Sequence, residues 1–368
     1  MKGASRFTIL AKGFLSFLPL LLLVFFSPSY PSQSSVSRAT ASLPDGSQQS
    51  ALQKLKQSFQ RPDQIPFPRH NPFSEAKYQL GKRLFFDPRL SRSQTLSCAS
   101  CHNPSLSWTD GLSRAKGHEQ KELTRRSPTL LNAAWGKTFF WDGRAETLEA
   151  QALGPIQSPQ EMNMPLPKLV KTINAITEYG PLFEAAFGTT PITAELIAKA
   201  IATFERTIVS DISPFDRWIS GEESAISEKA KKGFSLFSGK ATCIRCHSGW
   251  NFTNGQFADI GIPTQDRGRG SVTSNSAVDF AFKTPTLRNV ARRAPYMHDG
   301  SLVSLPEVIE NYHRGGIVSR PGTRLFLTPL SLSEEDKENL VAFLETLTSE
   351  DESVSIPLLP RGEMKEKP

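Results

Sequence analysis

Two copies of a Cys-x-x-Cys-His segment constrain this chain more than any other feature. The segments are Cys98-Ala-Ser-Cys101-His102 and Cys243-Ile-Arg-Cys246-His247. Two thiols three positions apart on one turn can both reach the vinyl groups of a haem, while the histidine that follows ligates the iron. The two segments contain all four cysteines of the chain, so none remains for a disulfide framework or a separate thiol nucleophile. The sequence therefore predicts two covalently bound c-type haems, with His102 and His247 as the proximal iron ligands.

Other uses of paired cysteines fit these segments less well. A structural zinc site needs four ligands that converge on one ion, and the two cysteine pairs lie far apart in the sequence. A thioredoxin-like redox pair does not require a histidine directly after the second cysteine. Haem attachment is therefore the interpretation that the two segments favour.

The N-terminus has the composition of an export signal. Three basic residues are followed by a largely apolar run over residues 13–26 and then by a stretch rich in Ser and Pro. This order predicts a cleaved signal peptide over residues 1–31 and a periplasmic location. A retained membrane anchor is the alternative, although the run is short for a full span and Pro19 interrupts it.

The charge of the chain argues against a nucleic-acid partner. The formal net charge is +7, and part of it lies in the signal peptide. No stripe of Lys and Arg with interleaved aromatic residues follows. Hydrophobic residues make up 38% of the chain, which is enough for a packed globular interior.

Apolar spacing predicts helices and no sheet. One helix begins after Ser74, a candidate N-cap, and ends at Asp87-Pro88. Further helices are expected over about 193–210 and 227–237. A last one opens at Ser333 with a sequence close to a capping box and continues through Leu347. No alternating apolar run is long enough for a sheet, so we expect a mainly α fold.

A weak internal repeat predicts two tandem cytochrome-c-like haem domains. Gly81-Lys-Arg-Leu-Phe85 precedes the first cysteine pair, and Gly233-Phe-Ser-Leu-Phe237 precedes the second. The expected parts of the chain are a flexible leader over 32–65, an N-terminal peroxidatic haem domain over 66–215, a C-terminal electron-transfer haem domain over 216–350 and a tail over 351–368.

Further motifs between Asn71 and Leu347 carry a family resemblance. Besides the two haem-binding segments, they are Trp108-Thr-Asp-Gly111, Ser127-Pro-Thr-Leu-Leu-Asn132, Trp141-Asp-Gly-Arg-Ala145, Glu161-Met162, Thr284-Pro-Thr-Leu-Arg-Asn289 and Pro295-Tyr-Met-His-Asp-Gly300. With these motifs the chain resembles the bacterial dihaem cytochrome c peroxidases and the MauG-type enzymes of methylamine utilisation. The resemblance implies a peroxidatic N-terminal haem and a C-terminal haem that passes electrons inward.

The resemblance also implies a set of site residues. His118 matches a removable distal histidine of the N-terminal haem, and Trp141 matches an aromatic relay between the haems. Glu161 matches the catalytic carboxylate, and Gln151 matches its polar companion. A carboxylate can move a proton between the two oxygens of peroxide, which is what cleavage of the O–O bond requires. Without the resemblance, His118 would be a solvated loop residue, Glu161 a residue at a helix start, and Trp141 a core residue.

The distal ligand of the second haem departs from the peroxidase pattern. Typical peroxidases of the family have Met at the position of Tyr312, whereas the MauG branch has Tyr, which ligates the electron-transfer haem. An anionic phenolate favours ferric iron and would lower the reduction potential. The alternative is that Tyr312 packs against the helix and the adjacent His313 is the ligand.

A second departure concerns calcium. The resemblance implies a calcium ion between the domains, held in part at positions that are Arg126 and Arg293 here. A guanidinium has no acceptor atom and cannot ligate a cation. Either the arginine charge takes the place of calcium or other groups hold the ion, and the first is our prediction.

Together these residues predict a peroxidase. It reduces hydrogen peroxide to water with electrons from a small periplasmic carrier, a cytochrome c or a cupredoxin. The alternatives are a MauG-type oxidase that acts on a partner protein and a dihaem electron carrier without catalysis. The resemblance is compatible with a homodimer.

Overall fold

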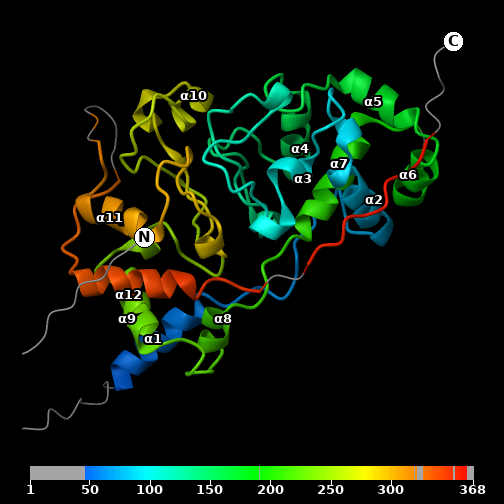
Figure 1. Ribbon diagram of the computed structural model, residues 1–368. Helices are drawn as coiled ribbons and strands as arrows, with labels where there is room; N and C mark the ends of the chain where they lie inside the picture. The colour runs from blue at the N-terminus through cyan, green and yellow to red at the C-terminus, as the bar shows by residue number, and fades with distance from the viewer. Residues whose placement is uncertain (1–45, 190, 319, 321–325, 351–352, 363–368) are drawn as a thin grey trace, which may run out of the picture. The chain divides into compact units, whose positions relative to one another are not determined.

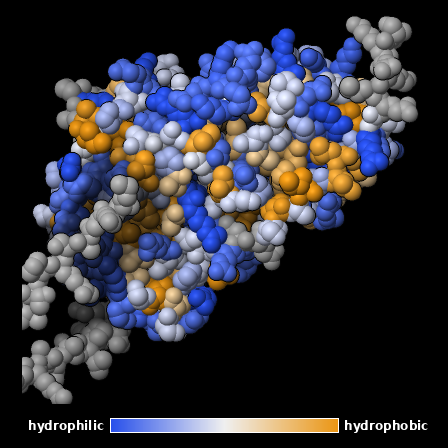
Figure 2. Space-filling model, viewed as in Figure 1, coloured by the Kyte–Doolittle hydropathy of each residue, from blue (hydrophilic) through white to orange (hydrophobic). Residues whose placement is uncertain are grey.

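The computed structural model describes most of the chain beyond its N-terminal region. The described residues are 46–189, 191–318, 320, 326–350 and 353–362. The predicted signal peptide and the first part of the predicted leader lie outside them. No described helix is long and apolar enough to cross a membrane. Figure 2 shows that hydrophobic residues on the viewed face lie in separate groups between hydrophilic ones.

The described part is mainly α-helical, as predicted (Figure 1). The helices are α1 (Gly46–Gln57), α2 (Glu75–Phe86), α3 (Cys98–Cys101), α4 (Leu148–Gln157), α5 (Leu166–Asn174), α6 (Tyr179–Phe187), α7 (Ala194–Arg206), α8 (Pro214–Ile219), α9 (Glu228–Ser238), α10 (Arg269–Thr273), α11 (Leu305–Arg314) and α12 (Glu334–Glu345). Short 3-10 turns cover Pro88–Leu90, Pro104–Leu106, His118–Gln120, Ala133–Trp135, Cys243–Arg245, Ser276–Val278 and Val290–Arg292. Two short antiparallel strands, β1 (Phe257–Ala258) and β2 (Phe282–Lys283), form the one sheet of the described residues.

The four helices predicted from apolar spacing are confirmed as α2, α7, α9 and α12. Their N-caps are Ser74, Thr193, Ser227 and Ser333, and each side chain accepts a hydrogen bond from a backbone N–H in the first turn. At α12 the carboxylate of Asp336 also accepts from the Ser333 backbone N–H at 3.0 Å, which completes a capping box.

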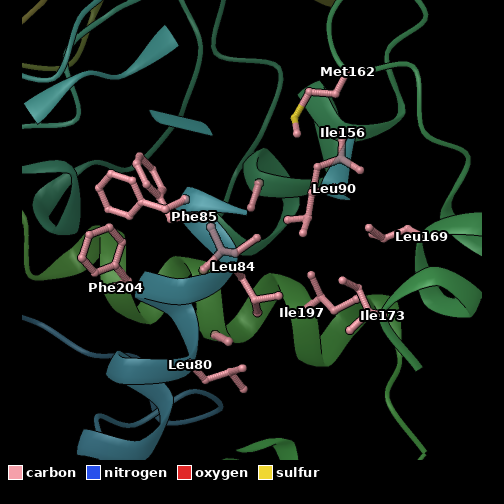
Figure 3. Close-up of a cluster of buried hydrophobic side chains, with 14 of the residues drawn as sticks. Leu80, Leu84, Phe85, Leu90, Ile156, Met162, Leu169, Ile173, Ile197 and Phe204 are labelled. Carbon is pink, nitrogen blue, oxygen red and sulfur yellow. The ribbon is translucent and has the colours of Figure 1, made fainter. Parts of the chain in front are cut away.

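Two hydrophobic cores lie in the two halves of the chain. In the first, α2 packs against α7, and Figure 3 shows Leu84 and Phe204 among the side chains that meet there. In the second, α9 packs against α12 around Phe234 and Phe343. The same pairing of a helix before the cysteines with a later helix therefore occurs twice, which agrees with the repeat seen in the sequence.

The repeated glycines lie where these helix pairs cross. A Cβ at Gly81 would overlap with the backbone carbonyl of Ala200 on α7. A Cβ at Gly233 would overlap with the carbonyl of Asn339 on α12. Each glycine is therefore required by close contact between two backbones, which explains why the repeat contains glycine in the middle of a helix.

We expect Gly81→Ala to lower the free energy of unfolding by about 1–3 kcal/mol or more, because the methyl group forces α2 away from α7. Denaturant unfolding of the haem-loaded protein measures the change. Gly180→Ala is the control, since nothing lies within 4 Å of a Cβ at Gly180 in α6. A Gly81→Ala protein as stable as the parent would contradict the close crossing.

The prediction of a flexible leader is wrong for the part that the structure describes. α1 is helical, and Phe59 is fully buried in the second core, where its ring centroid lies 4.9 Å from that of Phe252. The Lys56 ammonium lies 3.9 Å from the centroid of the Trp218 ring. The abundance of Ser, Gln and Pro over residues 32–65 obscured these few apolar contacts, which anchor the segment to the second half of the chain.

The predicted tail also differs from a free terminus. Val354 and Leu359 pack against the first core, and the backbone N–H of Arg361 donates to Glu178 at the start of α6. The C-terminal residues thus contact the N-terminal half, while the segment near Phe59 contacts the C-terminal half. The two halves are held together by both ends of the described chain.

The loops that follow the two haem-binding segments also resemble each other, and equivalent residues of the two loops are separated by a constant number of positions. The bridge between Phe139 and Ala145 has its counterpart between Tyr296 and Leu302. Each bridge is followed by a helix, α4 or α11, that a hydroxyl side chain caps. α4 packs on α7 as α11 packs on α12. Residues at equivalent places in α4 and α11 therefore occupy equivalent places beside the two haem-binding segments.

Candidate functional site

One large cavity runs along both haem-binding segments. Its volume is about 1100 Å³, slightly above the usual range for ligand pockets in proteins. Side chains from both halves of the chain line it. Among them are all six residues predicted to bind haem, Cys98, Cys101, His102, Cys243, Cys246 and His247.

The two histidines are oriented by backbone carbonyls. Nδ1 of His102 lies 3.2 Å from the carbonyl oxygen of Trp108, and Nδ1 of His247 lies 2.9 Å from that of Phe252. When Nδ1–H donates to the carbonyl, Nε2 keeps a lone pair for a metal. Burial lowers the pKa of both imidazoles, that of His247 to about 4, so both are neutral at ordinary pH.

The cysteines share a turn with each histidine. The His102 backbone N–H donates to the Cys98 carbonyl at 2.9 Å, and the His247 N–H donates to the Cys243 carbonyl at the same distance. None of the four cysteines forms a disulfide, and burial raises the pKa of Cys101 to about 11. Each turn thus presents two protonated thiols and one neutral imidazole to the cavity. This donor set fits a covalently attached haem.

The repeat pairs one cavity-lining residue of α11 with one of α4. Tyr312 on α11 lines the cavity, and the equivalent residue on α4 is Pro155, which lines it too. A tyrosine can ligate iron through its hydroxyl, whereas proline has no side-chain ligand atom. His313, the alternative ligand in the sequence, is not among the lining residues. Burial raises the pKa of Tyr312. Tyr312 thus faces the cavity and His313 does not, and the role of Tyr312 as an iron ligand stays a prediction.

The predicted acid–base residues lie together around Pro155. Gln151 on α4 and Glu161 just after it both line the cavity. Oε1 of Gln151 is buried and has no hydrogen-bond partner. Burial raises the pKa of Glu161, although a hydrogen bond from Ser158 opposes the shift. A carboxyl with a raised pKa exchanges protons closer to neutral pH than an exposed glutamate does.

Trp141 also lines the cavity and is fixed by both halves of the chain. Its indole Nε1–H donates to the Arg126 carbonyl at 3.0 Å, and its own carbonyl accepts from the Lys283 backbone N–H at 2.8 Å. The side chain is thus oriented within the first half while the backbone is tied to the second. This placement suits the predicted relay.

His118 is not among the residues that line the cavity. It lies at the tip of a hairpin closed by a bridge between Lys116 and Glu122. Its Nδ1 is buried without a partner, and its Nε2 lies 3.8 Å from a carboxylate oxygen of Glu119. The His118 backbone N–H donates to the Gln160 carbonyl at 3.0 Å, so the hairpin contacts the segment that carries Glu161. The role of His118 as a distal ligand stays a prediction.

Among the lining residues that sequence reasoning missed, Pro155 and Glu205 bear most directly on the site. Pro155 could have been found by aligning α4 with α11, since it stands where the repeat has Tyr312. Glu205 on α7 is 3% exposed, and burial raises its pKa to about 8. Glu205 stands four residues after Ile201, on the helix face predicted to be apolar. A charged residue on that face is the sequence signal that could have identified it.

The two arginines predicted to replace calcium do lie together. Nη1 of Arg126 donates to the backbone carbonyl of Arg293 at 2.9 Å. Both side chains line the cavity, and both residues are 7% exposed. A carbonyl that could face a cation is thus engaged by a guanidinium.

Comparison with known proteins agrees with these centres. Residues 75–224 match the family described as di-haem cytochrome c peroxidase, and residues 230–348 match cytochrome c. The methylamine utilization protein MauG of Methylorubrum extorquens is 51% identical, over 88% of this chain and 92% of that protein. The cytochrome c551 peroxidase of Pseudomonas aeruginosa is 37% identical, over 81% and 86%. The crystal structure of a MauG-like protein associated with microbial copper homeostasis covers 79% of this chain and 95% of its own, with 33% identity and a TM-score of 0.72.

Proposed function

The chain belongs to the family of di-haem cytochrome c peroxidases and MauG proteins, and from this premise we propose that it reduces hydrogen peroxide with electrons from a small carrier protein. Its fold is that of two tandem cytochrome-c-like domains, which the sequence predicted, and it carries two covalently bound c-type haems. Peroxide, two electrons and two protons give two molecules of water.

One observation carries the proposal, which is the group of residues around Pro155. In the second half of the chain the repeat has Tyr312 at this place, a residue that can ligate iron. In the first half it has proline, with Gln151 and Glu161 beside it along the cavity. A centre that keeps a coordination position open beside a proton-transfer group suits catalysis better than electron carriage.

Glu161 moves a proton in this proposal. Its carboxylate takes a proton from one oxygen of peroxide and delivers it to the other, which leaves as water. Gln151 orients the peroxide, because its buried amide has an unused acceptor. When bound, the N-terminal haem iron supplies the place at which the O–O bond breaks and the electrons that the break consumes.

Trp141 and Tyr312 serve the supply of electrons. Trp141 lines the cavity that both haem-binding segments share and is held from both halves of the chain. Tyr312 would hold the iron of the C-terminal haem. His118 would hold that of the N-terminal haem before activation, and a movement of its hairpin would release it. Its contact with Gln160 would couple that movement to the segment that carries Glu161.

A second candidate is oxidation of a partner protein. Tyr312 and the 51% identity to a methylamine utilization protein MauG favour it. In this candidate the same two centres remove electrons from side chains of the partner, and peroxide takes them up. A cytochrome c donor belongs to the leading proposal, because two relatives are named cytochrome c551 peroxidase. Export to the periplasm, predicted from the N-terminal sequence, and a cupredoxin as the other donor are parts of the same proposal.

Purified dihaem protein mixed with a reduced small cytochrome c, and separately with a reduced cupredoxin, tests the proposal. Oxidation of either carrier at a rate that depends on both peroxide and enzyme supports the peroxidase. Without turnover, and with both haems attached, the partner-protein oxidase becomes the better account.

We also propose that no calcium ion holds the boundary between the two halves. Since the Arg126 guanidinium donates to the Arg293 carbonyl, we expect a divalent-cation chelator to leave both haem spectra and the melting temperature unchanged. Thermal unfolding with and without the chelator measures this. A fall in melting temperature that added calcium restores would contradict the proposal.

A further inference from the structure

Three cations lie along the cavity without a carboxylate in ion-pair contact, two of them buried arginines and the third a half-buried lysine. They are Arg126, Arg293 and Lys283, and all three line the cavity. None of them makes an ion pair with another described residue. Burying a charge without a partner is costly, so folded proteins supply an opposite charge.

The hydrogen bonds of these cations leave donors unused. Nη1 of Arg126 donates a hydrogen bond to the Arg293 carbonyl, while Nε and Nη2 of Arg126 are buried without a partner. Arg293 donates through Nη2 to the Thr286 carbonyl, and its Nε is buried without a partner. The Lys283 ammonium donates to the Thr138 carbonyl at 2.7 Å. Carbonyl acceptors hold the side chains in place but do not neutralise their charge.

The arrangement follows the internal repeat. Arg126 precedes Ser127-Pro128, and Lys283 precedes the equivalent Thr284-Pro285. The Arg126 backbone N–H donates to the His298 carbonyl at 2.9 Å, and the Lys283 N–H donates to the equivalent Trp141 carbonyl at 2.8 Å. Each cation therefore stands at the boundary between the halves, joined to the half opposite its own.

Nearby carboxylates are engaged elsewhere. The charge of Asp142 acts to raise the pKa of Lys283, but the Asp142 carboxylate is paired with two arginines. One of its oxygens lies 2.7 Å from Nη1 of Arg125 and 3.0 Å from Nη1 of Arg144. Asp110, whose charge acts to raise the pKa of Arg126, makes no ion pair with it and accepts from the Ser127 hydroxyl at 3.0 Å. Burial, and to a lesser extent Arg126, lower the pKa of Arg293 to about 9, which is the cost of its unneutralised charge.

We propose that Arg126, Arg293 and Lys283 form one binding site for haem propionate carboxylates at the boundary between the two halves. Each haem carries two such carboxylates, and the two covalently bound haems bring them into the cavity that these cations line. Charged hydrogen bonds from the unused donors would satisfy both partners. The site rests on haem attachment and not on the proposed peroxidase activity.

The site also sets the reduction potentials. A cation near the haem favours the reduced iron, which carries one positive charge fewer. We expect Arg293→Gln to lower the equilibrium constant for reduction of at least one haem on the order of tenfold, equivalent to about 59 mV for a one-electron couple. A spectroscopic redox titration without peroxide measures this change. Because the titration does not require peroxidase activity, its result stays valid even if the protein shows no peroxide turnover.

Three further variants complete the experiment. Arg292→Gln is the matched control, because Arg292 is the exposed neighbour of Arg293 and should keep the parent potentials. Arg293→Lys retains a charge and should recover most of the shift. If Arg293→Gln does not yield folded dihaem protein, Lys283→Met is judged by the same criterion. Potentials equal to those of the parent in the variant that folds would overturn the proposal.

Free phosphate could bind the same cations. Potentials that stay constant as inorganic phosphate is added support the haem carboxylates as the occupants. A potential that moves with phosphate in the parent but not in Arg293→Gln would show that a free anion occupies the site and would overturn the assignment.

Discussion

Replacing Glu161 by glutamine is expected to lower peroxide turnover about 10²–10⁴-fold, which is the usual contribution of a general acid–base group. The amide keeps the size and a polar atom of the side chain but cannot take up and release a proton. Steady-state oxidation of a reduced cytochrome c by peroxide measures the loss. Since His102 and His247 are oriented by backbone carbonyls, both haem spectra should remain those of the parent.

Glu146→Gln is the matched control for this variant. Glu146 is exposed, lies just before α4 and is not among the residues that line the cavity. We expect it to turn over peroxide at the parent rate. Turnover by Glu161→Gln equal to that of Glu146→Gln would remove Glu161 from the mechanism, while altered haem spectra would mean that the change disturbs the haem itself.

Replacing Tyr312 by methionine is expected to raise the reduction potential of the C-terminal haem. A thioether favours ferrous iron, whereas a phenolate favours ferric iron. Axial ligands span about 0.8 V among haem proteins, so the shift should be on the order of 0.1 V or more. A redox titration followed in the absorption spectrum measures it, and the N-terminal haem provides an internal reference.

The neighbouring histidine supplies the contrast. His313 does not line the cavity, so His313→Gln should leave the potential of the C-terminal haem at the parent value. A large shift in His313→Gln together with none in Tyr312→Met would make His313 the ligand. It would also require α11 to turn relative to its position in the structure.

Local rules explain why part of the fold was predictable. Ser74, Thr193, Ser227 and Ser333 cap their helices because a hydroxyl oxygen reaches a free N–H of the first turn, which depends on a few neighbouring residues only. The Cys-x-x-Cys-His turns are local in the same sense. The sequence reveals such features because the residues that make them are close together in the chain.

Contacts between distant segments explain what was missed. Phe59 looks like a lone aromatic in a polar leader, and only the pocket formed by the second core shows why it is buried. Glu205 reads as an ordinary helix charge until α7 is seen to turn it toward the cavity. Pro155 has no chemical signature of its own, and its meaning comes from its equivalence to Tyr312.

The residues of the candidate site also differ in how well the sequence predicted them. The family resemblance placed Glu161, Gln151 and Trp141 in one site, and the structure brings all three to one cavity. For His118 the resemblance and the structure differ, since the hairpin holds the imidazole outside the cavity lining. His118 belongs to a loop, and the role proposed for it requires that loop to move.

The most direct test of the central claim is the stoichiometry of peroxide reduction. A catalytic amount of the dihaem protein is mixed with excess reduced cytochrome c, and known portions of hydrogen peroxide are added. The account predicts that two carrier molecules are oxidised for each peroxide through many additions, because each peroxide takes up two electrons. Oxidation that stops once the enzyme's own two haems have given up their electrons would contradict it, and the chain would then not be a peroxidase for this class of donor.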